Sequence, residues 1–408
     1  MKMIQLTLYH FFICDILTLN FYKCGERMKV ITDNSGKIVI GYKEDGNTEC
    51  IIPDGVTRIG RKAFKDCKSL RSITMGNNLE KIEGLAFDDC QNLNSVTFLD
   101  GLKTIEEKAF KDCKNLTEVI LPNSLSIIEN GAFWNCRNLE KLVLPNNLTK
   151  IPDNAFTNCR NLLEIILPDS LTAIGEYSFV NCYELKSIKF PDNLMTIGEG
   201  AFSCCSNLDD IVLPKGLIEI GKRAFCQCKK ITEITIPNNV KTIGAMAFYS
   251  CYNLKNITLS DSITSIDKSA FNMCLIKNVN VSSYKVYNLL GGNMKLLATL
   301  SILKNHYNNE NVQYTEEEMQ NLTEYIKSKR FELFHYVSKD ENLYKFMMND
   351  AGFGFSYEEA MNIVNNNSKM EVKFMMMQYI HNHNLKKKSI LDDWDDEMEK
   401  SNPDAYHK

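Results

Sequence analysis

One unit of a repeating pattern runs through Leu116-Thr-Glu-Val119-Ile-Leu121-Pro122-Asn-Ser-Leu125-Ser-Ile-Ile128-Glu-Asn-Gly-Ala-Phe133-Trp-Asn-Cys136. The same apolar pattern returns every 23 residues, without insertion or deletion, over ten units that end at Cys274. Its most regular members are a phenylalanine series and a cysteine series that follows it three residues later. The first members of the two series are Phe64, Phe87, Phe110, Phe133 and Phe156, and Cys67, Cys90, Cys113, Cys136 and Cys159. Self-similarity at such a fixed period is the signature of a repeat architecture.

Each unit contains two extended segments and one compact segment. Residues 116–121 are apolar and rich in β-branched side chains, so they predict a short strand that stops at Pro122, which cannot donate to a strand ladder. Asn123 and Ser124 supply a turn, and residues 125–128 predict a second extended piece. Residues 132–136 predict a compact or 3₁₀-like segment on another side of the coil.

A single unit has too little apolar surface to fold alone, so the units must stack. Stacking would bury Leu on Leu, Ile on Ile, Phe on Phe and Cys on Cys in continuous ladders. Strands of neighbouring units that pair in parallel would lie about 4.8 Å apart. The predicted fold class is therefore a β-rich repeat solenoid with short parallel strands. The 23-residue spacing is lost after Cys274, which predicts a small α-helical module behind the solenoid.

The composition fits a folded soluble protein and excludes several other classes. The chain has 408 residues, of which 44% are hydrophobic and 24% charged, which does not fit disorder, collagen or a coiled coil. Its 47 basic and 51 acidic residues give a net charge of -4, which excludes a generally basic nucleic-acid binder. The apolar run near the N-terminus is too broken by polar residues for a membrane span.

The repeat resembles the leucine-rich repeats of the BspA-like family. The family pattern, roughly L-x-x-I-x-I-P-x-x-L-x-x-I-G-x-x-A-F-x-x-C, stands here as Leu208-Asp-Asp-Ile211-Val-Leu213-Pro214-Lys-Gly-Leu217-Ile-Glu-Ile220-Gly221-Lys-Arg-Ala224-Phe225-Cys-Gln-Cys228. The resemblance covers residues 51–280 and implies a leucine-rich-repeat solenoid. Because such repeats serve many binding roles, it implies little about the particular function.

The limits of the repeat divide the chain into five segments. We expect an N-terminal β cap over residues 28–50, the solenoid of ten units over 51–283, a helical module over 284–384 and a charged tail over 385–408. Within the cap, residues 34–36 supply the turn of a hairpin. Residues 1–27 allow three interpretations: a wrongly assigned start with the true first residue at Met28, which we favour, a weak signal or anchor, or a structural segment.

The region behind the solenoid carries helix signals. Capping boxes at 315–318, 356–359 and 368–371 predict three helix starts, and Asp340 would cap a further short helix. Short helices separated by polar turns indicate antiparallel helix pairs. Residues 339–382 resemble degenerate ankyrin-like helix pairs, although the T-P-L-H signature of ankyrin repeats is missing. The tail has six acidic and no basic residues between Leu391 and Glu399.

The cysteine series allows three interpretations. Equivalent cysteines in stacked coils point the same way about 4.8 Å apart, whereas a disulfide needs Cβ atoms about 3.8 Å apart on converging vectors. A soft-metal ladder would need repeated C-x-x-C pairs or nearby histidines, which this sequence does not have. We therefore expect the thiols to pack in the core, with no metal and no cofactor. Free thiols in such number predict a reducing compartment, hence the cytoplasm.

The sequence contains no recognisable catalytic constellation. No histidine lies between His10 and His306, which excludes a Cys-His or Ser-His-Asp system inside the solenoid. His381 and His383 are two residues apart, a poor metal-ligand spacing on a helix, and no P-loop or G-x-G-x-x-G is present. We therefore expect that the protein is not an enzyme.

A binding surface can be predicted from strand alternation. In each unit the residue between the two buried strand positions points to the solvent side. These residues are Thr74, Thr97, Ile120, Val143, Ile166, Lys189, Val212, Thr235 and Thr258. We predict a partner site at Ile120, Val143, Ile166, Lys189 and Val212, with a charged rim at Glu118, Glu140, Lys141 and Glu164. An exposed apolar stripe suggests a partner, but β-branched residues could equally be there to stabilise the strands.

These patterns predict a non-enzymatic scaffold that binds a protein or peptide on the exposed sheet face through a few apolar anchors. The alternative is a secreted or cell-surface adhesin that binds host or matrix protein, as some BspA-like proteins do. Neither function involves nucleic acid or a membrane span. The oligomeric state stays open.

Overall fold

The computed structural model describes residues 28–43, 46–307, 314–337, 355–366 and 370–382. It divides the chain into two compact units, Met1–Gly291 and Gly292–Lys408. The first unit contains the repeats and the second contains only helices within its described part. The expected start-site segment 1–27, the helix capped by Asp340 and the tail 385–408 lie outside the described residues.

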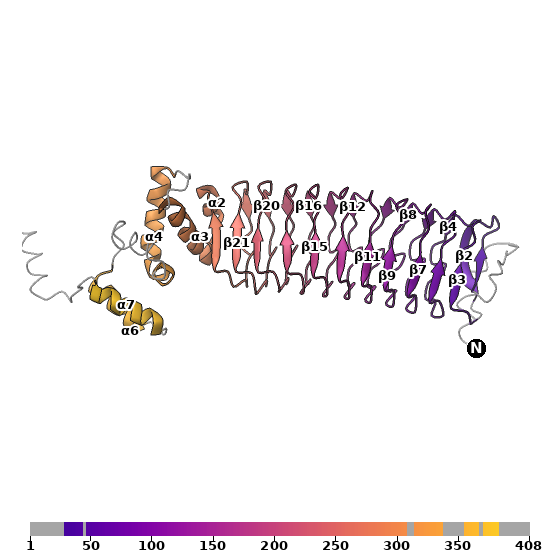
Figure 1. Cartoon of the computed structure of the whole chain (residues 1–408), viewed down its shortest axis with the longest axis horizontal. Helices are drawn as coiled ribbons and strands as arrows, with labels where there is room; N and C mark the ends of the chain where they lie inside the picture. The colour runs from indigo at the N-terminus through magenta and orange to yellow at the C-terminus, as the bar shows by residue number, and fades with distance from the viewer. Residues whose placement is uncertain (1–27, 44–45, 308–313, 338–354, 367–369, 383–408) are drawn as a thin grey trace, which may run out of the picture. The chain divides into compact units, whose positions relative to one another are not determined.

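The repeats form a solenoid in which every coil contributes one longer and one two-residue strand (Figure 1). The longer strands are β3 (Glu49–Ile51), β5 (Ser72–Thr74), β7 (Ser95–Thr97), β9 (Glu118–Ile120), β11 (Lys141–Val143), β13 (Glu164–Ile166), β15 (Ser187–Lys189), β17 (Asp210–Val212), β19 (Glu233–Thr235), β21 (Asn256–Leu259) and β23 (Asn278–Val281). We call the surface that they form the long-strand face. The two-residue strands are β4 (Arg58–Ile59), β6 (Lys81–Ile82), β8 (Thr104–Ile105), β10 (Ile127–Ile128), β12 (Lys150–Ile151), β14 (Ala173–Ile174), β16 (Thr196–Ile197), β18 (Glu219–Ile220), β20 (Thr242–Ile243) and β22 (Ser265–Ile266).

Neighbouring coils pair in parallel and in register with the repeat. Val119 of β9 lies opposite Leu142 of β11, which lies opposite Ile165 of β13, each 23 residues from the last. The predicted fold class, a solenoid of short parallel strands followed by a helical module, is confirmed. The long-strand face is not one continuous sheet, however: it consists of β3-β5-β7, β9 to β17, and β19-β21-β23.

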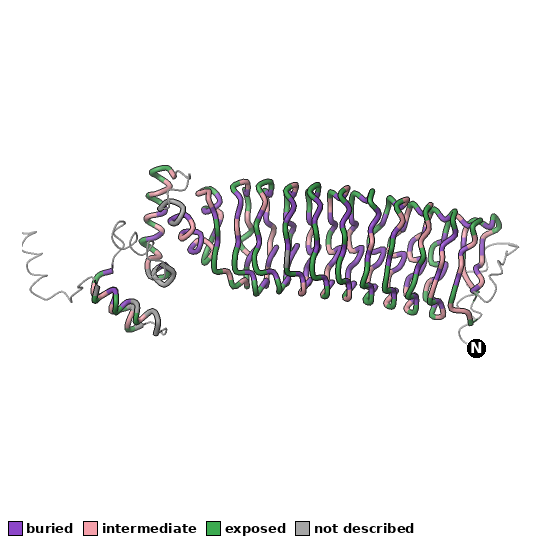
Figure 2. The backbone as a smooth tube through the Cα atoms, in the orientation of Figure 1, coloured by how far each residue is buried: buried purple, intermediate pink, exposed green. Residues whose placement is uncertain are grey.

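The interior is apolar and is built from like side chains. Figure 2 shows that buried segments recur at the same place in successive coils. The rings of the phenylalanine series stack with centroids 4.8–5.6 Å apart and planes within 12° of parallel. Phe64, Phe110 and Phe156 have no exposed surface, and neither do Cys67 and Cys113. Close packing of this kind is the main source of stability in a repeat protein, because each coil buries its apolar side only against its neighbours.

The compact segment before each ladder cysteine contains a left-handed residue. At the first six of these positions the residue is Asp or Asn with φ between 60° and 63°. Those residues are Asp66, Asp89, Asp112, Asn135, Asn158 and Asn181. Asp and Asn are the L-residues that best tolerate this region, so the local sequence agrees with the turn that the coil requires.

The N-terminal end of the solenoid is closed by a hairpin of β1 (Lys29–Thr32) and β2 (Ile38–Lys43), which pair antiparallel. The carboxylate of Asp33 accepts hydrogen bonds from the backbone N–H of Lys37 (3.1 Å) and of Ile38 (3.0 Å), which holds the turn. β2 then pairs with β4 in parallel and so passes the register to the repeats. The ring of Tyr42 stacks on Phe64 and extends the phenylalanine ladder by one ring.

At the other end of the first unit the period shortens by one residue. Asn278 of β23 lies opposite Asn256, 22 residues earlier, whereas the preceding coils are 23 residues apart. Val279 and Val281 are buried in this last strand, and helix α2 (Tyr284–Leu289) follows it with Val286 and Tyr287 buried. The shortened coil and the helix end the repeat.

The described helices of the second unit are α3 (Gly292–Tyr307), α4 (Glu316–Val337), α6 (Tyr357–Asn366) and α7 (Met370–Asn382). Two predicted capping boxes are formed: Thr315 and Glu318 exchange hydrogen bonds at the start of α4, and Ser356 and Glu359 do so at α6. Between α6 and α7 a small core contains Phe355, Ala360, Met376 and Tyr379. None of the helices in the described ranges is both long and apolar enough to cross a membrane.

Candidate functional site

The geometry of the long-strand face follows from strand alternation. In β9 the middle residue, Val119, is fully buried, while Glu118 and Ile120 on either side of it are exposed. The pattern of one buried residue between two more exposed ones is repeated in β11, β13 and β15. Each coil therefore presents two side chains from its strand to solvent, at a position set by the register.

The predicted stripe lies in one row along this face. Ile120 is opposite Val143, Val143 opposite Ile166, Ile166 opposite Lys189, and Lys189 opposite Val212. The exposed fraction is 49% for Ile120, 74% for Ile166 and 75% for Val212, and Val143 is half-buried. The row thus exposes apolar side chains on both sides of one lysine.

One further apolar residue on this face was missed by the sequence analysis. Leu163, directly before β13, is 42% exposed, and the equivalent residue of the preceding unit is Glu140. Comparing this position between units would have found it, because most units carry a polar residue there.

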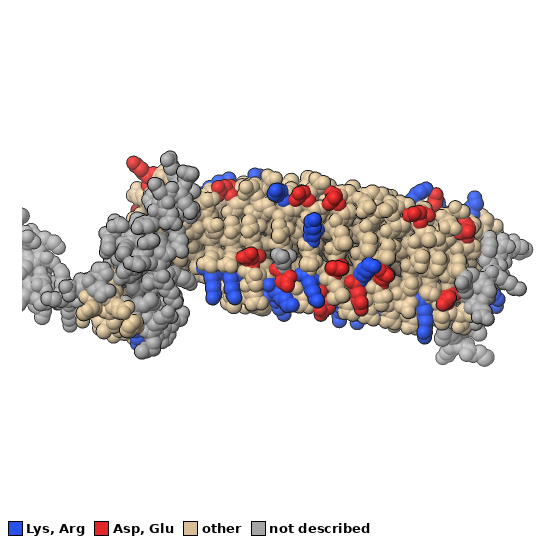
Figure 3. Space-filling model, viewed as in Figure 1, with Lys and Arg blue, Asp and Glu red and all other residues tan. Residues whose placement is uncertain are grey.

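The predicted rim is exposed and partly paired. Lys141 lies between Glu118 and Glu164 in the register and forms an ion pair with Glu118. Glu140 is also exposed. Figure 3 shows an almost uncharged band along the visible face of the solenoid, between two rows of charged side chains. Exposed ion pairs of this type stabilise a fold by at most about 1 kcal/mol, so this pair contributes little to the stability of the solenoid.

The cysteine ladder is inert in this structure. All thirteen cysteines that the structure describes are free thiols. From Cys90 to Cys274, each ladder thiol donates a hydrogen bond to the carbonyl oxygen of the Phe 26 residues earlier, at 3.0–3.5 Å. Burial raises the pKa of Cys113, Cys136 and Cys182 well above the ordinary thiol value. A buried, protonated thiol is neither a nucleophile nor a metal ligand.

The last rung differs from the others. Cys274 is half-buried, and its contact with the Cys251 thiol lowers its pKa, while the same contact and burial raise the pKa of Cys251. Within the described part of the chain, no group of three or more His, Cys, Asp or Glu side chains is arranged to hold a metal ion.

The fold and this face define a leucine-rich-repeat solenoid. The family model of the BspA type leucine rich repeat region, which describes six copies of the repeat, matches this chain. The matched residues are 42–163, 126–229, 149–278 and 218–333. Together these matches extend over more than half of the 408 residues, so the chain belongs to this family. Proteins of this family are non-enzymatic repeat proteins, and leucine-rich repeats are typically protein-interaction scaffolds.

Solved bacterial structures are similar to this chain. The pneumococcal vaccine antigen PcpA is 20% identical, with 69% of this chain and 88% of that chain covered and a TM-score of 0.42. A leucine rich cell surface protein from Faecalibacterium prausnitzii is 21% identical, with coverage of 64% and 94% and a TM-score of 0.34. A leucine-rich repeat protein from Bacteroides ovatus is 21% identical, with coverage of 66% and 94% and a TM-score of 0.29.

No sequence match was found among curated proteins. The comparisons do not support the ankyrin-like resemblance expected for residues 339–382. They also do not support the expected cytoplasmic location. The physical argument for that location is weakened as well, because buried thiols with a raised pKa are shielded from oxidants in any compartment.

Proposed function

We propose that this protein is an interaction scaffold that binds a protein or peptide on its long-strand face, centred on Ile120, Val143 and Ile166. The observation that carries the proposal is the exposure of apolar side chains in one register row, up to 74% for Ile166. A rigid sheet holds such side chains in place before binding, which lowers the entropic cost of association. Glu118, Glu140, Lys141 and Glu164 would form the polar rim.

Strand propensity alone does not account for this row. In β5, β7, β19 and β21 the same register position is occupied by threonine, which is β-branched and polar. Isoleucine or valine occupies it in β3 and in four of the five strands from β9 to β17, although the backbone requirement is the same in all the coils. The run of exposed apolar residues in neighbouring coils from β9 to β17 favours a binding role.

The test compares two variants that each place an aspartate at the same register position, one on β13 and one on β7. Full-length protein is immobilised as wild type, Ile166→Asp and Thr97→Asp, and the proteins that each one captures from native extract are quantified. Truncating a central apolar anchor typically costs about 2 kcal/mol or more, so Ile166→Asp should lose roughly 30-fold in affinity. Thr97→Asp, on β7, should bind as wild type, and all three should share one circular dichroism spectrum. Equal capture by the two variants would remove the row from consideration as the site.

For the cellular setting we propose the alternative, a secreted or cell-surface adhesin that binds host or matrix protein. Membership of the BspA type family favours it, because adhesins are found among BspA-like proteins. Surface biotinylation and protease treatment of intact native cells decide the matter. Labelled and protease-sensitive protein supports the proposal, whereas protein that is protected and released with the cytosol contradicts it.

A further inference from the structure

The long-strand face is split between β17 and β19, where one sheet ends and the next begins. The two strands belong to neighbouring coils that are 23 residues apart in sequence.

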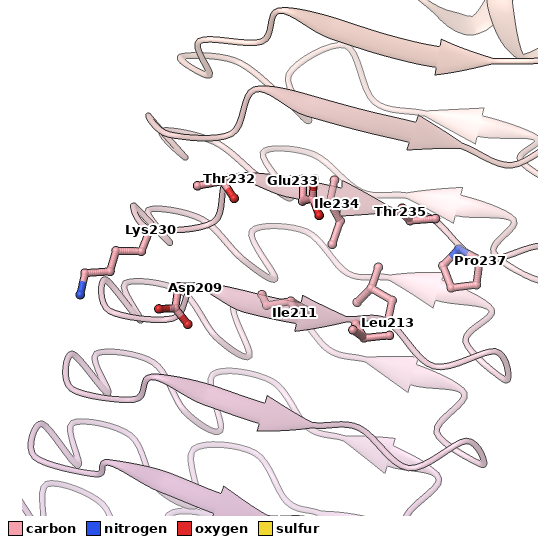
Figure 4. Close-up of a pocket in the computed structure, with 10 residues that line it drawn as sticks. Asp209, Ile211, Leu213, Lys230, Thr232, Glu233, Ile234, Thr235 and Pro237 are labelled. Carbon is pink, nitrogen blue, oxygen red and sulfur yellow. The ribbon is translucent and has the colours of Figure 1, made fainter.

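The split forms a groove of about 470 Å³ on the surface, within the usual size range of ligand pockets, about 300–1,000 Å³. Its two ends differ chemically, because parallel strands place their starts at the same end. Figure 4 shows Asp209 and Lys230 toward that end, Glu233, Ile211 and Ile234 in the middle, and Leu213 and Pro237 toward the other end. Val212, 75% exposed and the last member of the proposed binding row, also lines it.

We propose that this groove is a specificity subsite for an extended peptide that carries a basic and an aliphatic side chain four residues apart. The proposal rests on the proposed protein-binding function and names a recognition element for it. The carboxylate of Glu233 is complementary to a lysine or arginine, and the apolar end fits a leucine or isoleucine. Lys230 also lines the groove, but Figure 4 shows its side chain pointing away from Glu233.

The spacing follows from strand geometry. Glu233 and Pro237 are four residues apart on one coil, which corresponds to about 13 Å at about 3.3 Å per residue. An extended peptide that runs beside β19 covers this length with four residues of its own. Residues i and i+4 of an extended chain point to the same side, so both side chains enter the groove, whereas residues three apart point to opposite sides.

The test uses the full chain and three labelled heptapeptides, with binding followed by fluorescence anisotropy. The first is Thr-Lys-Thr-Ser-Thr-Leu-Thr, the second replaces its lysine by glutamate, and the third moves the leucine one place nearer to the lysine. The first peptide should bind at least about tenfold more tightly than the other two. Thr235→Trp, which fills the groove, should abolish this binding, and Thr97→Trp, at the same register on β7, should retain it. Glu233→Lys should reverse the preference between lysine and glutamate, a result that loss of folding cannot produce.

Equal affinity for the three peptides, or unchanged binding by Thr235→Trp, would overturn the proposal. Loss of peptide binding as the protein concentration rises would overturn it too, because a second copy of the chain would then occupy the groove. The outcomes distinguish a failure of the groove proposal from a failure of the proposed protein-binding function. If Ile166→Asp abolishes partner capture while the peptides fail, only the groove assignment is wrong. If the peptides bind selectively while Ile166→Asp has no effect on partner capture, the assignment of the apolar row as the binding site is wrong and the groove assignment stands.

Discussion

Replacing Ser178 by alanine should make the solenoid more stable. Ser178 has no exposed surface, and its hydroxyl has no hydrogen-bond partner within the described structure. The equivalent residue is alanine in the nine other units: Ala63, Ala86, Ala109, Ala132, Ala155, Ala201, Ala224, Ala247 and Ala270. Serine is thus a local exception at a buried position that is otherwise alanine.

The size of the effect can be worked out from this environment. A buried hydroxyl without a partner costs about 1–3 kcal/mol, and removing one oxygen atom leaves almost no cavity to offset the gain. We expect Ser178→Ala to raise the free energy of unfolding by about 1–2 kcal/mol. Each kcal/mol corresponds to a rise of about 2–4 °C in the melting temperature. Backbone hydrogen bonding is unaffected, because the Phe156 N–H donates to the carbonyl oxygen of residue 178 at 2.8 Å in either case.

The assay is urea unfolding followed by circular dichroism, combined with native-state hydrogen exchange at the Phe156 amide. Exchange is needed because a solenoid can open locally, in which case one global transition would miss a change in a single coil. The matched control is the reverse substitution in the next coil, Ala201→Ser, which should lower stability by a similar amount. If Ser178→Ala is neutral or destabilising, the hydroxyl has a partner and the reasoning fails.

Two further predictions concern the ladder and the coil contacts. Burial raises the pKa of thiols such as Cys113, Cys136 and Cys228, so on the alkaline side the unfolded chain loses protons that the folded chain keeps. Below the ordinary thiol pKa of about 8.5 the protonated thiols contribute their full stability to the fold. Above that pH the free energy of unfolding falls by up to about 1.4 kcal/mol per pH unit for each thiol. Urea unfolding midpoints measured between pH 7 and 10.5 test this, and constant midpoints would contradict it. Gly221→Ala would place a Cβ within 2.7–2.8 Å of backbone atoms of Ile197 and Gly198, whereas nothing lies within 4 Å at Gly291. We expect Gly221→Ala to lower the urea midpoint by an amount equivalent to about 1–3 kcal/mol and Gly291→Ala to leave it nearly unchanged, and equal midpoints would refute the close coil contact.

The sequence was sufficient to predict the stacking of coils and the direction of the strand side chains. Both follow from the period: once Phe133 and Phe156 are equivalent, every residue 23 positions apart is equivalent too. Strand alternation then places Val119 inside and Ile120 outside without further information. The role of the exposed row remains a prediction, because exposure identifies a surface and not its partner.

Other features depend on three-dimensional detail that the period does not contain. The thiols were expected to pack as small apolar groups, and the structure adds a hydrogen bond from each to a Phe carbonyl of the preceding coil, such as Cys136 to Phe110 at 3.3 Å. Which carbonyl faces the sulfur depends on the shape of the compact segment. Likewise, Leu85 and Tyr177 adopt φ of 59° and 53°, a conformation that their side chains do not favour and that the stacked coils impose.

The same reasoning explains why specificity should be sought at the irregular coils. A residue that packs against its neighbours is constrained to match them, so the interior varies little from Phe64 to Phe248. Outward residues of the strands are free of that constraint, and the change from threonine to isoleucine or valine in the middle coils has no packing requirement. Between β17 and β19 the sheet is interrupted. We therefore expect departures from the repeat to mark binding sites, and the peptide preference of the Glu233→Lys variant tests this expectation between β17 and β19.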